Sequence, residues 1–147
     1  MPGPLSAPHH PTTPSPITQP PNYPATDLPQ KPVPSPLVIS DIWSLCDRAD
    51  TLPWQPFRPG VDIYRLYGDS TGPSAALLRY APGAQVPHHD HTGYEHILVL
   101  SGSQRDQHQT YPAGSLVINA PDSDHWVASD DGCLVLVMWE KPVAIRE

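Results

Sequence analysis

The chain has 147 residues, of which 22 are prolines, and its 15 acidic and 8 basic residues give a formal net charge of −7. This length fits one domain, and an acidic chain without a stripe of lysine or arginine is not expected to bind nucleic acid. No apolar run approaches the ~20 residues of a membrane-spanning helix, and the N-terminus lacks the features of a secretory signal, so we expect a cytoplasmic protein that does not bind a membrane.

Residues 1–36 differ from the rest of the chain in composition. They contain 13 of the 22 prolines, together with serine and threonine, and few large apolar side chains. Such a segment cannot bury enough surface to offset the entropy of ordering it. We therefore expect a disordered proline-rich tail over residues 1–36 and one folded domain over residues 37–147. His9 and His10 lie in this tail and are interpreted as solvated.

The predicted domain begins with a short helix and a connector. Ser40 and Asp41 can cap a helix, and the apolar residues that follow keep helical spacing until about Ala49. Residues 52–57, with the sequence LPWQPF, combine proline with aromatic side chains. We expect them to form a rigid connector that packs across one end of the domain.

From Val61 onward, short apolar runs alternate with turn residues. The predicted strands are residues 61–67, 74–80, 95–100, 115–119, 125–128 and 133–139. Many short strands at regular spacing, with glycine, proline and aspartate between them, predict an all-β sandwich or barrel. Cys133 opens the last run and is predicted to be a buried, unreactive thiol. Whether it pairs with Cys46 is left open by the sequence.

The segment GAQVPHHDHTGYEH, residues 83–96, contains the strongest chemical signal. Alternate residues of a strand share a face, so His89, His91 and Glu95 would point the same way in a regular strand. Two imidazoles and a carboxylate on one face can bind a divalent metal. His125 follows a turn at the start of a predicted strand and is the fourth candidate ligand. A polar loop that simply contains several histidines is the alternative interpretation.

This arrangement resembles the two motifs of the cupin superfamily. The first motif, G-x5-H-x-H-x3-E-x6-G, is matched by Gly83, His89, His91, Glu95 and Gly102. The second motif is matched by Pro112, Gly114 and His125, while Asp122 stands where its stricter form has glycine. The likeness covers about residues 52–142.

Within the cupins, the chain is similar to the ChrR-like group. The similar segments are LLRYAPGAQVPHHDHTGYEHILVLSG, YPAGSLVINAPDSDH and DDGCLVLVMWEKP. The resemblance implies a cupin fold, that is, a double-stranded β-helix or jelly-roll barrel, which often forms homodimers. It also implies a divalent ion (zinc, iron, manganese or nickel) bound by His89, His91, Glu95 and His125. Anti-sigma members carry a helical zinc-binding domain before the cupin, and residues 1–36 do not resemble it, so an anti-sigma role is not expected.

The remaining candidate residues have other expected positions. His88 should face away from the ligand pair, and His96 should lie on the face opposite Glu95. His108 belongs to a polar hairpin tip, residues 104–110, and is expected to be solvated. Either Arg79 or Tyr80 is expected to point into the barrel, toward a bound anion.

The sequence leaves three functions open. The domain could bind or sense a small molecule at its metal site without turnover. It could be a small iron-dependent dioxygenase that acts on a dicarbonyl or a hydroxy-ketone. It could also bind or isomerise a sugar or another small metabolite. Zinc binding without turnover, oxygen uptake with Fe(II), and ligand-induced stabilisation without oxygen uptake would distinguish these three possibilities.

Overall fold

The computed structural model describes residues 3, 17–18 and 34–146, and most of the predicted tail lies outside these described residues. The chain divides into two compact units, residues 1–45 and 46–147. In the first unit, strand β1 (Ile17–Thr18) pairs antiparallel with strand β2 (Val38–Ile39). No helix in the described residues is long and apolar enough to cross a membrane.

The predicted helix is present, and it has the tighter 3-10 form. Helix η1 covers Ile42–Thr51. The Ser44 amide and hydroxyl both donate to the Asp41 carbonyl, and the Leu52 amide donates to the Ala49 carbonyl. These bonds join residues three apart, which is the 3-10 pattern common in short helices and at helix ends.

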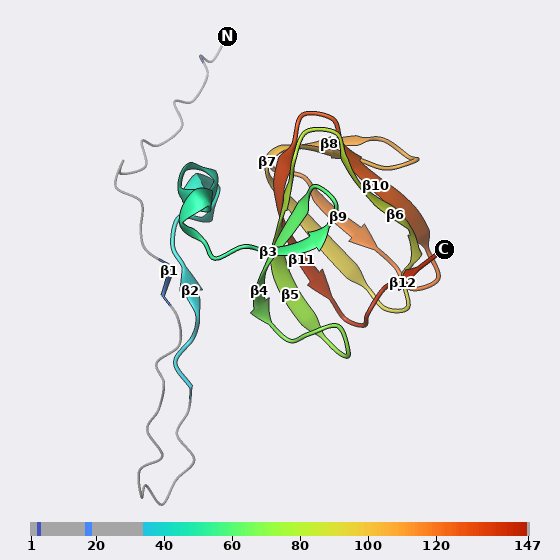
Figure 1. The fold of residues 1–147 in the computed structure, drawn as a ribbon, viewed down its shortest axis with the longest axis horizontal. Helices are drawn as coiled ribbons and strands as arrows, with labels where there is room; N and C mark the ends of the chain where they lie inside the picture. The colour runs from blue at the N-terminus through green and yellow to red at the C-terminus, as the bar shows by residue number, and fades with distance from the viewer. Residues whose placement is uncertain (1–2, 4–16, 19–33, 147) are drawn as a thin grey trace, which may run out of the picture. The chain divides into compact units, whose positions relative to one another are not determined.

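The second unit is a ten-stranded antiparallel sheet that curls on itself (Figure 1). Its strands are β3 (Gln55–Arg58), β4 (Val61–Tyr67), β5 (Ser74–Tyr80), β6 (Ala84–Asp90), β7 (Glu95–Arg105), β8 (Thr110–Pro112), β9 (Leu116–Asn119), β10 (Asp124–Ser129), β11 (Cys133–Trp139) and β12 (Ala144–Ile145). The strand order is β12-β6-β10-β7-β11-β5-β4-β3, and β8 and β9 also pair with β7. The all-β prediction is confirmed. The residues that we expected to form a connector partly form β3, which pairs with β4.

Strand β7 is longer than predicted, because Gly102 does not end it. The N-terminal part of β7 pairs with β9 and β11, and its C-terminal part pairs with β8 and β10. Gly102 has a φ of 71°, and a Cβ at this position would lie 2.1 Å from the Gly132 carbonyl oxygen. A glycine here permits the positive φ and the close approach of two backbones without ending the strand. Strand β7 therefore joins the part of the sheet that contains β9 and β11 to the part that contains β8 and β10.

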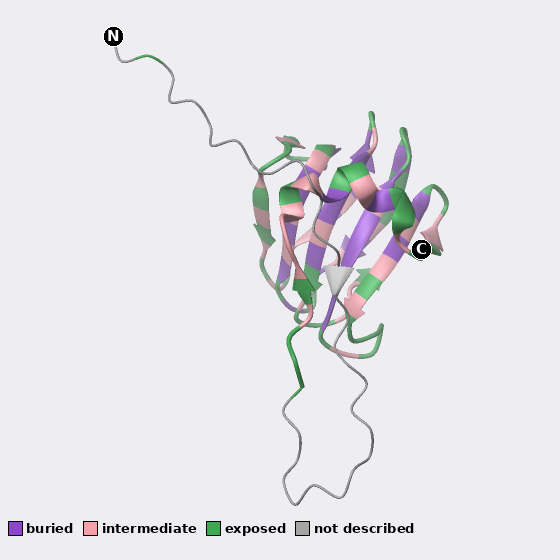
Figure 2. Cartoon of the chain, turned by 90° about the vertical axis from the view of Figure 1, so that its left-hand side faces the viewer, coloured by how far each residue is buried: buried purple, intermediate pink, exposed green. Residues whose placement is uncertain are grey.

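Apolar side chains of the strands fill the barrel interior. Buried and exposed residues alternate along several strands (Figure 2), as expected when one face of each strand points inward. The core includes Val61, Ile63, Leu78, Val99, Val135 and Val137, with Phe57 and Trp139 packed against it. Cys133 is buried as predicted, and no disulfide joins it to the exposed Cys46. A small group of buried polar side chains lies among these apolar residues.

Candidate metal centre

The four predicted ligands come from three strands that meet at one side of the interior. His89 is the penultimate residue of β6, His91 follows the end of that strand, and Glu95 begins β7. His125 is the second residue of β10 and pairs directly with His89. The shared direction of His89, His91 and Glu95 was predicted from one regular strand. The structure instead brings Glu95 back through a turn between β6 and β7.

The donor atoms of these four residues converge. One ligand atom from each residue can be chosen so that all lie within 4.8 Å of one another, and every side chain is buried. The Nε2 atoms of His91 and His125 lie 3.2 and 3.3 Å from Glu95 Oε1. Both nitrogens are buried, yet neither makes a hydrogen bond of acceptable geometry. Unpaired buried polar atoms are costly, so their grouping points to a missing partner.

The other ring nitrogen of each histidine is held by the protein. His89 Nδ1 lies 2.8 Å from the Pro87 carbonyl oxygen, which can only accept a hydrogen bond. His125 Nδ1 lies 3.4 Å from Asp106 Oδ2. His91 Nδ1 lies 2.9 Å from the Ser123 hydroxyl, whose own hydrogen is donated to the Ala120 carbonyl. Each Nδ1 therefore carries the proton, and each Nε2 lone pair remains available to a cation.

Glu95 is held by its neighbours on both adjacent strands. Asn119 on β9 and Trp139 on β11 are its direct cross-strand partners. Asn119 Nδ2 donates to Oε1 over 3.2 Å, and Trp139 Nε1 donates to Oε2 over 2.7 Å. Directly opposite residues in antiparallel strands lie on the same face, which explains why these donors reach the carboxylate.

The environment favours the protonation states that bind a cation. Burial raises the pKa of Glu95, but the adjacent His125 and His91 side chains outweigh this and lower it overall, so the carboxylate stays ionised. Burial lowers the pKa of His89, which keeps this imidazole neutral. Three imidazole nitrogens and one carboxylate oxygen form a donor set that suits a divalent transition metal or zinc. The residues present therefore fit such an ion.

The turn before His125 explains a departure from the family motif. Asp122 adopts a φ of 69°, a conformation that glycine tolerates best and aspartate tolerates better than most residues. Its amide donates to the His91 carbonyl over 2.9 Å. Aspartate can therefore replace the expected glycine while the turn still presents His125 to the site.

The other predicted positions are mostly confirmed. His88 points away from the ligand cluster, and its Nε2 lies 2.6 Å from Asp124 Oδ2. His96 pairs with residues of the outer face, and His108 is exposed. Tyr80 is the residue that points into the barrel, while Arg79 lies outside, paired with Asp50 and Asp62.

Several residues of the site were not singled out by sequence reasoning. Asn119 and Trp139 hold Glu95, but their role depends on cross-strand register, which the sequence did not reveal. Asp106 was placed in a solvated hairpin tip; instead it is buried and accepts from the His108 and Gln109 amides and the Tyr111 hydroxyl. Arg58 was assigned to no site, and no sequence signal distinguished it.

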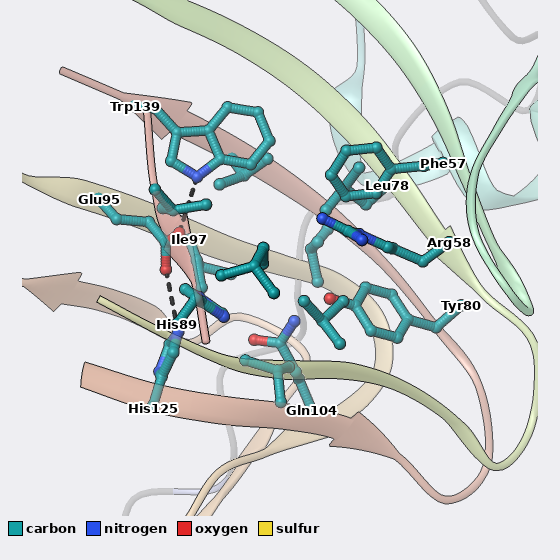
Figure 3. Close-up of a pocket in the computed structure, with 16 residues that line it drawn as sticks. Phe57, Arg58, Leu78, Tyr80, His89, Glu95, Ile97, Gln104, His125 and Trp139 are labelled. Carbon is teal, nitrogen blue, oxygen red and sulfur yellow. Dashed lines mark hydrogen bonds and ion pairs between the residues drawn. The ribbon is translucent and has the colours of Figure 1, made fainter. Parts of the chain in front are cut away.

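A small cavity adjoins the candidate metal centre. His89, Glu95 and His125 form part of its wall, together with Tyr80, Gln104 and Arg58 on other strands (Figure 3). The rest of the lining is largely apolar, and the cavity volume is about 40 Å³. A single ordered water needs roughly 10–15 Å³ on this scale, so the space suits a small molecule. A cation at the centre would therefore face a cavity that a ligand can occupy.

Comparison with known proteins gives a consistent family match. The family model described as "ChrR Cupin-like domain" matches residues 45–143. The anti-sigma-E factor ChrR of Cereibacter sphaeroides is 35% identical over 99 residues, which cover 65% of this chain and 46% of that protein. The chain thus spans about half the length of this curated relative.

Solved structures agree on the fold. The ChrR in the Rhodobacter sphaeroides complex of SigE with the anti-sigma ChrR is similar with a TM-score of 0.58 and 27% identity, over 71% of this chain and 56% of that chain. An acetylacetone dioxygenase from Acinetobacter johnsonii has a TM-score of 0.63 over 83% of this chain and 84% of that chain. Its identity is 14%, so this likeness shows the cupin fold alone.

Proposed function

The chain belongs to the ChrR cupin-like domain family, and from this premise we propose that it binds a divalent metal and senses a small molecule there. The proposed ligands are His89, His91, Glu95 and His125. The observation that carries the proposal is the inward-facing set of Nε2 lone pairs, fixed by protein partners at Nδ1, around one ionised carboxylate. The surrounding domain is assigned to residues 37–147, with a proline-rich tail before it.

Metal analysis of purified protein tests this assignment. We expect one zinc, iron, manganese or nickel ion per chain in the unmodified protein. The double variant His89→Ala/His125→Ala should lose this ion while keeping the β-rich circular dichroism spectrum, because two of four donors are removed. His108→Ala, which changes an exposed histidine outside the cluster, is the matched control and should keep full stoichiometry. A double variant that retains one ion per chain would refute the ligand assignment.

A dioxygenase is the second candidate, and the apolar cavity beside the cluster favours it. Ferrous iron held by these four residues would supply oxygen activation, and the apolar lining would exclude bulk water from the bound substrate. Oxygen consumption by the anaerobically Fe(II)-loaded chain with pentane-2,4-dione tests this function. Sustained oxygen consumption would favour catalysis. Tight zinc binding, together with no oxygen consumption by the Fe(II)-loaded chain, would favour sensing.

We also propose a homodimer that forms through the outer face of the sheet. His96 on β7 lies between Ile118 on β9 and Met138 on β11, and both flanking side chains are exposed. Tyr67 and Tyr94 extend this exposed apolar surface and line the same hollow. Exposed apolar patches of this kind often mark interfaces. Light scattering should give a dimer mass for the unmodified chain and a monomer mass for Ile118→Glu.

A further inference from the structure

Arg58 lies on the cavity wall without a charged partner. It ends β3, its Nε atom is buried without a hydrogen-bond partner, and in the described part of the chain it forms no ion pair. The Phe57 ring lies beside its guanidinium, 5.7 Å from the Cζ atom to the ring centroid. Figure 3 shows the two side chains reaching toward the cavity from the side opposite His125 and Glu95. An arginine without a partner in this position is available to a ligand.

Arg58 also lies between the cavity and a neighbouring hollow. A second hollow, with a volume of about 140 Å³, shares five lining residues with the cavity. These residues are Phe57, Arg58, Trp139, Val143 and Ile145. The second hollow also contains Arg65 and Asp69, whose opposite charges offset each other. Arg58 is therefore the unbalanced positive charge between the two spaces.

Charge balance indicates the kind of ligand. A divalent ion at the centre is offset by the Glu95 carboxylate and by the buried Asp106 carboxylate behind His125, and Arg58 adds one positive charge across the same cavity. Uncompensated charge in an apolar interior is unfavourable, so an anion would complete the site. The guanidinium fork matches a carboxylate in geometry, and the apolar side chains between the two ends suit a short carbon skeleton.

We propose that the ligand is a small organic carboxylate, with its carboxylate paired to Arg58 and a second oxygen donor directed to the metal centre. Tyr80 and Gln104 line the same wall, and a side-chain hydrogen bond joins them, so they can orient the middle of the ligand. The inference rests on the proposed metal-binding function and adds the chemical class of its ligand.

A matched pair of probes tests the inference on the full chain loaded with zinc. The probe 4-oxopentanoate carries a ketone and a distal carboxylate, and hexane-2,5-dione replaces the carboxylate with a neutral methyl ketone of similar shape. Calorimetric titration should show that 4-oxopentanoate binds at least about tenfold more tightly, the factor expected from a charge-assisted hydrogen bond. Equal affinity of the two probes, or no binding of either, would overturn the inference.

Variants of Arg58 identify the group that recognises the carboxylate. Arg58→Gln should abolish the preference for 4-oxopentanoate, and Arg58→Lys should restore part of it because the positive charge returns. Arg79→Gln is the control, since Arg79 is an arginine of the outer face, and it should keep the full preference. A preference that survives Arg58→Gln would overturn the inference. If the chain binds zinc but does not prefer the carboxylate probe, only this inference is overturned. If the chain does not bind zinc, the proposed function is overturned and the inference with it.

Discussion

Charged side chains on the outer surface of the barrel are paired with each other, whereas polar groups that face its interior lack such partners. On the outside, arginines lie 2.7–3.0 Å from aspartates: Arg79 from Asp50, Arg105 from Asp130, and Arg146 from Asp90 and Asp124. Beside the cavity, the half-buried Arg58 has no such partner among the described residues, and the buried Nε2 atoms of His91 and His125 are left without hydrogen bonds. These surface pairs are satisfied within the chain, whereas a bound ion or ligand would supply the partners that the inward-facing groups lack.

This difference separates structural from functional polar groups. Surface ion pairs contribute little to stability, because water screens both partners. Buried polar atoms without partners carry a real cost, so they persist where a ligand supplies the missing interaction. Substitutions in the interior should therefore change metal or ligand binding, and substitutions on the surface should change neither.

The largest effect is expected from Asp106, which is buried against His125 Nδ1. Asp106→Asn should weaken metal binding by about 10–100-fold, because it removes the carboxylate that orients the imidazole. A competition titration with a chelator of known affinity measures this change. Asp130→Asn, which alters an aspartate paired with Arg105 on the surface, should leave the affinity unchanged. Equal affinities for the two variants would remove the distinction between interior and surface.

A change of pH tests the same interior groups without any substitution. Protons compete with the metal for the imidazole nitrogens, and free imidazole has a pKa of about 6.5. Burial lowers the pKa of His89, and the pKa of Glu95 is lowered as well, so both keep their binding forms as the pH begins to fall. We expect a constant affinity above about pH 7.5 and a loss of at least about tenfold by pH 5.5. An affinity that stays constant down to pH 5 would exclude histidine ligation.

Asp122 belongs to both regions, because its backbone conformation positions His125 in the interior while its own side chain is exposed. Asp122→Gly should preserve both stability and metal content, since glycine adopts a φ of 69° without strain. Asp122→Val should lower the free energy of unfolding by about 1–2 kcal/mol and weaken metal binding. Chemical denaturation and metal analysis measure both effects. An Asp122→Val variant with unchanged stability would show that the turn is not constrained.

The smallest effect is expected at Arg79. This side chain pairs with Asp50 and lies over the Trp54 ring, 4.7 Å from the Cζ atom to the ring centroid. Arg79→Ala should lower the free energy of unfolding by less than about 1 kcal/mol and should not change metal content. Urea denaturation checks the first expectation, and elemental analysis checks the second. A loss of metal in this variant would link the surface to the site.

Six of the ten strands of the sheet, and the four convergent residues, could be predicted from the sequence, whereas β3, β6, β8 and β12 were not predicted as strands. Alternating runs identified β4, β5 and β11 with their observed bounds, because each is an apolar segment between clear turn residues. His89, His91, Glu95 and His125 were identified through motif spacing. Local patterns of this kind persist in the fold because strand period and turn chemistry are local properties.

The partners of these residues depend on contacts between distant segments. Trp139 reaches Glu95 because β11 pairs with β7 in one particular register, and Asp106 reaches His125 across a hairpin. Arg58 directly follows residues 52–57, whose prolines favoured a connector over a strand. Sequence spacing does not determine which strands become neighbours, so the groups that orient the ligands became visible only in the folded chain.

Anomalous diffraction from crystals of the zinc-loaded chain, recorded at the zinc absorption edge, would show directly whether the four proposed ligands bind one metal ion. We expect one strong anomalous peak per chain, within about 2.0–2.2 Å of donor atoms from His89, His91, Glu95 and His125. A map without a peak between these four side chains, or with its only strong peak elsewhere, would contradict it.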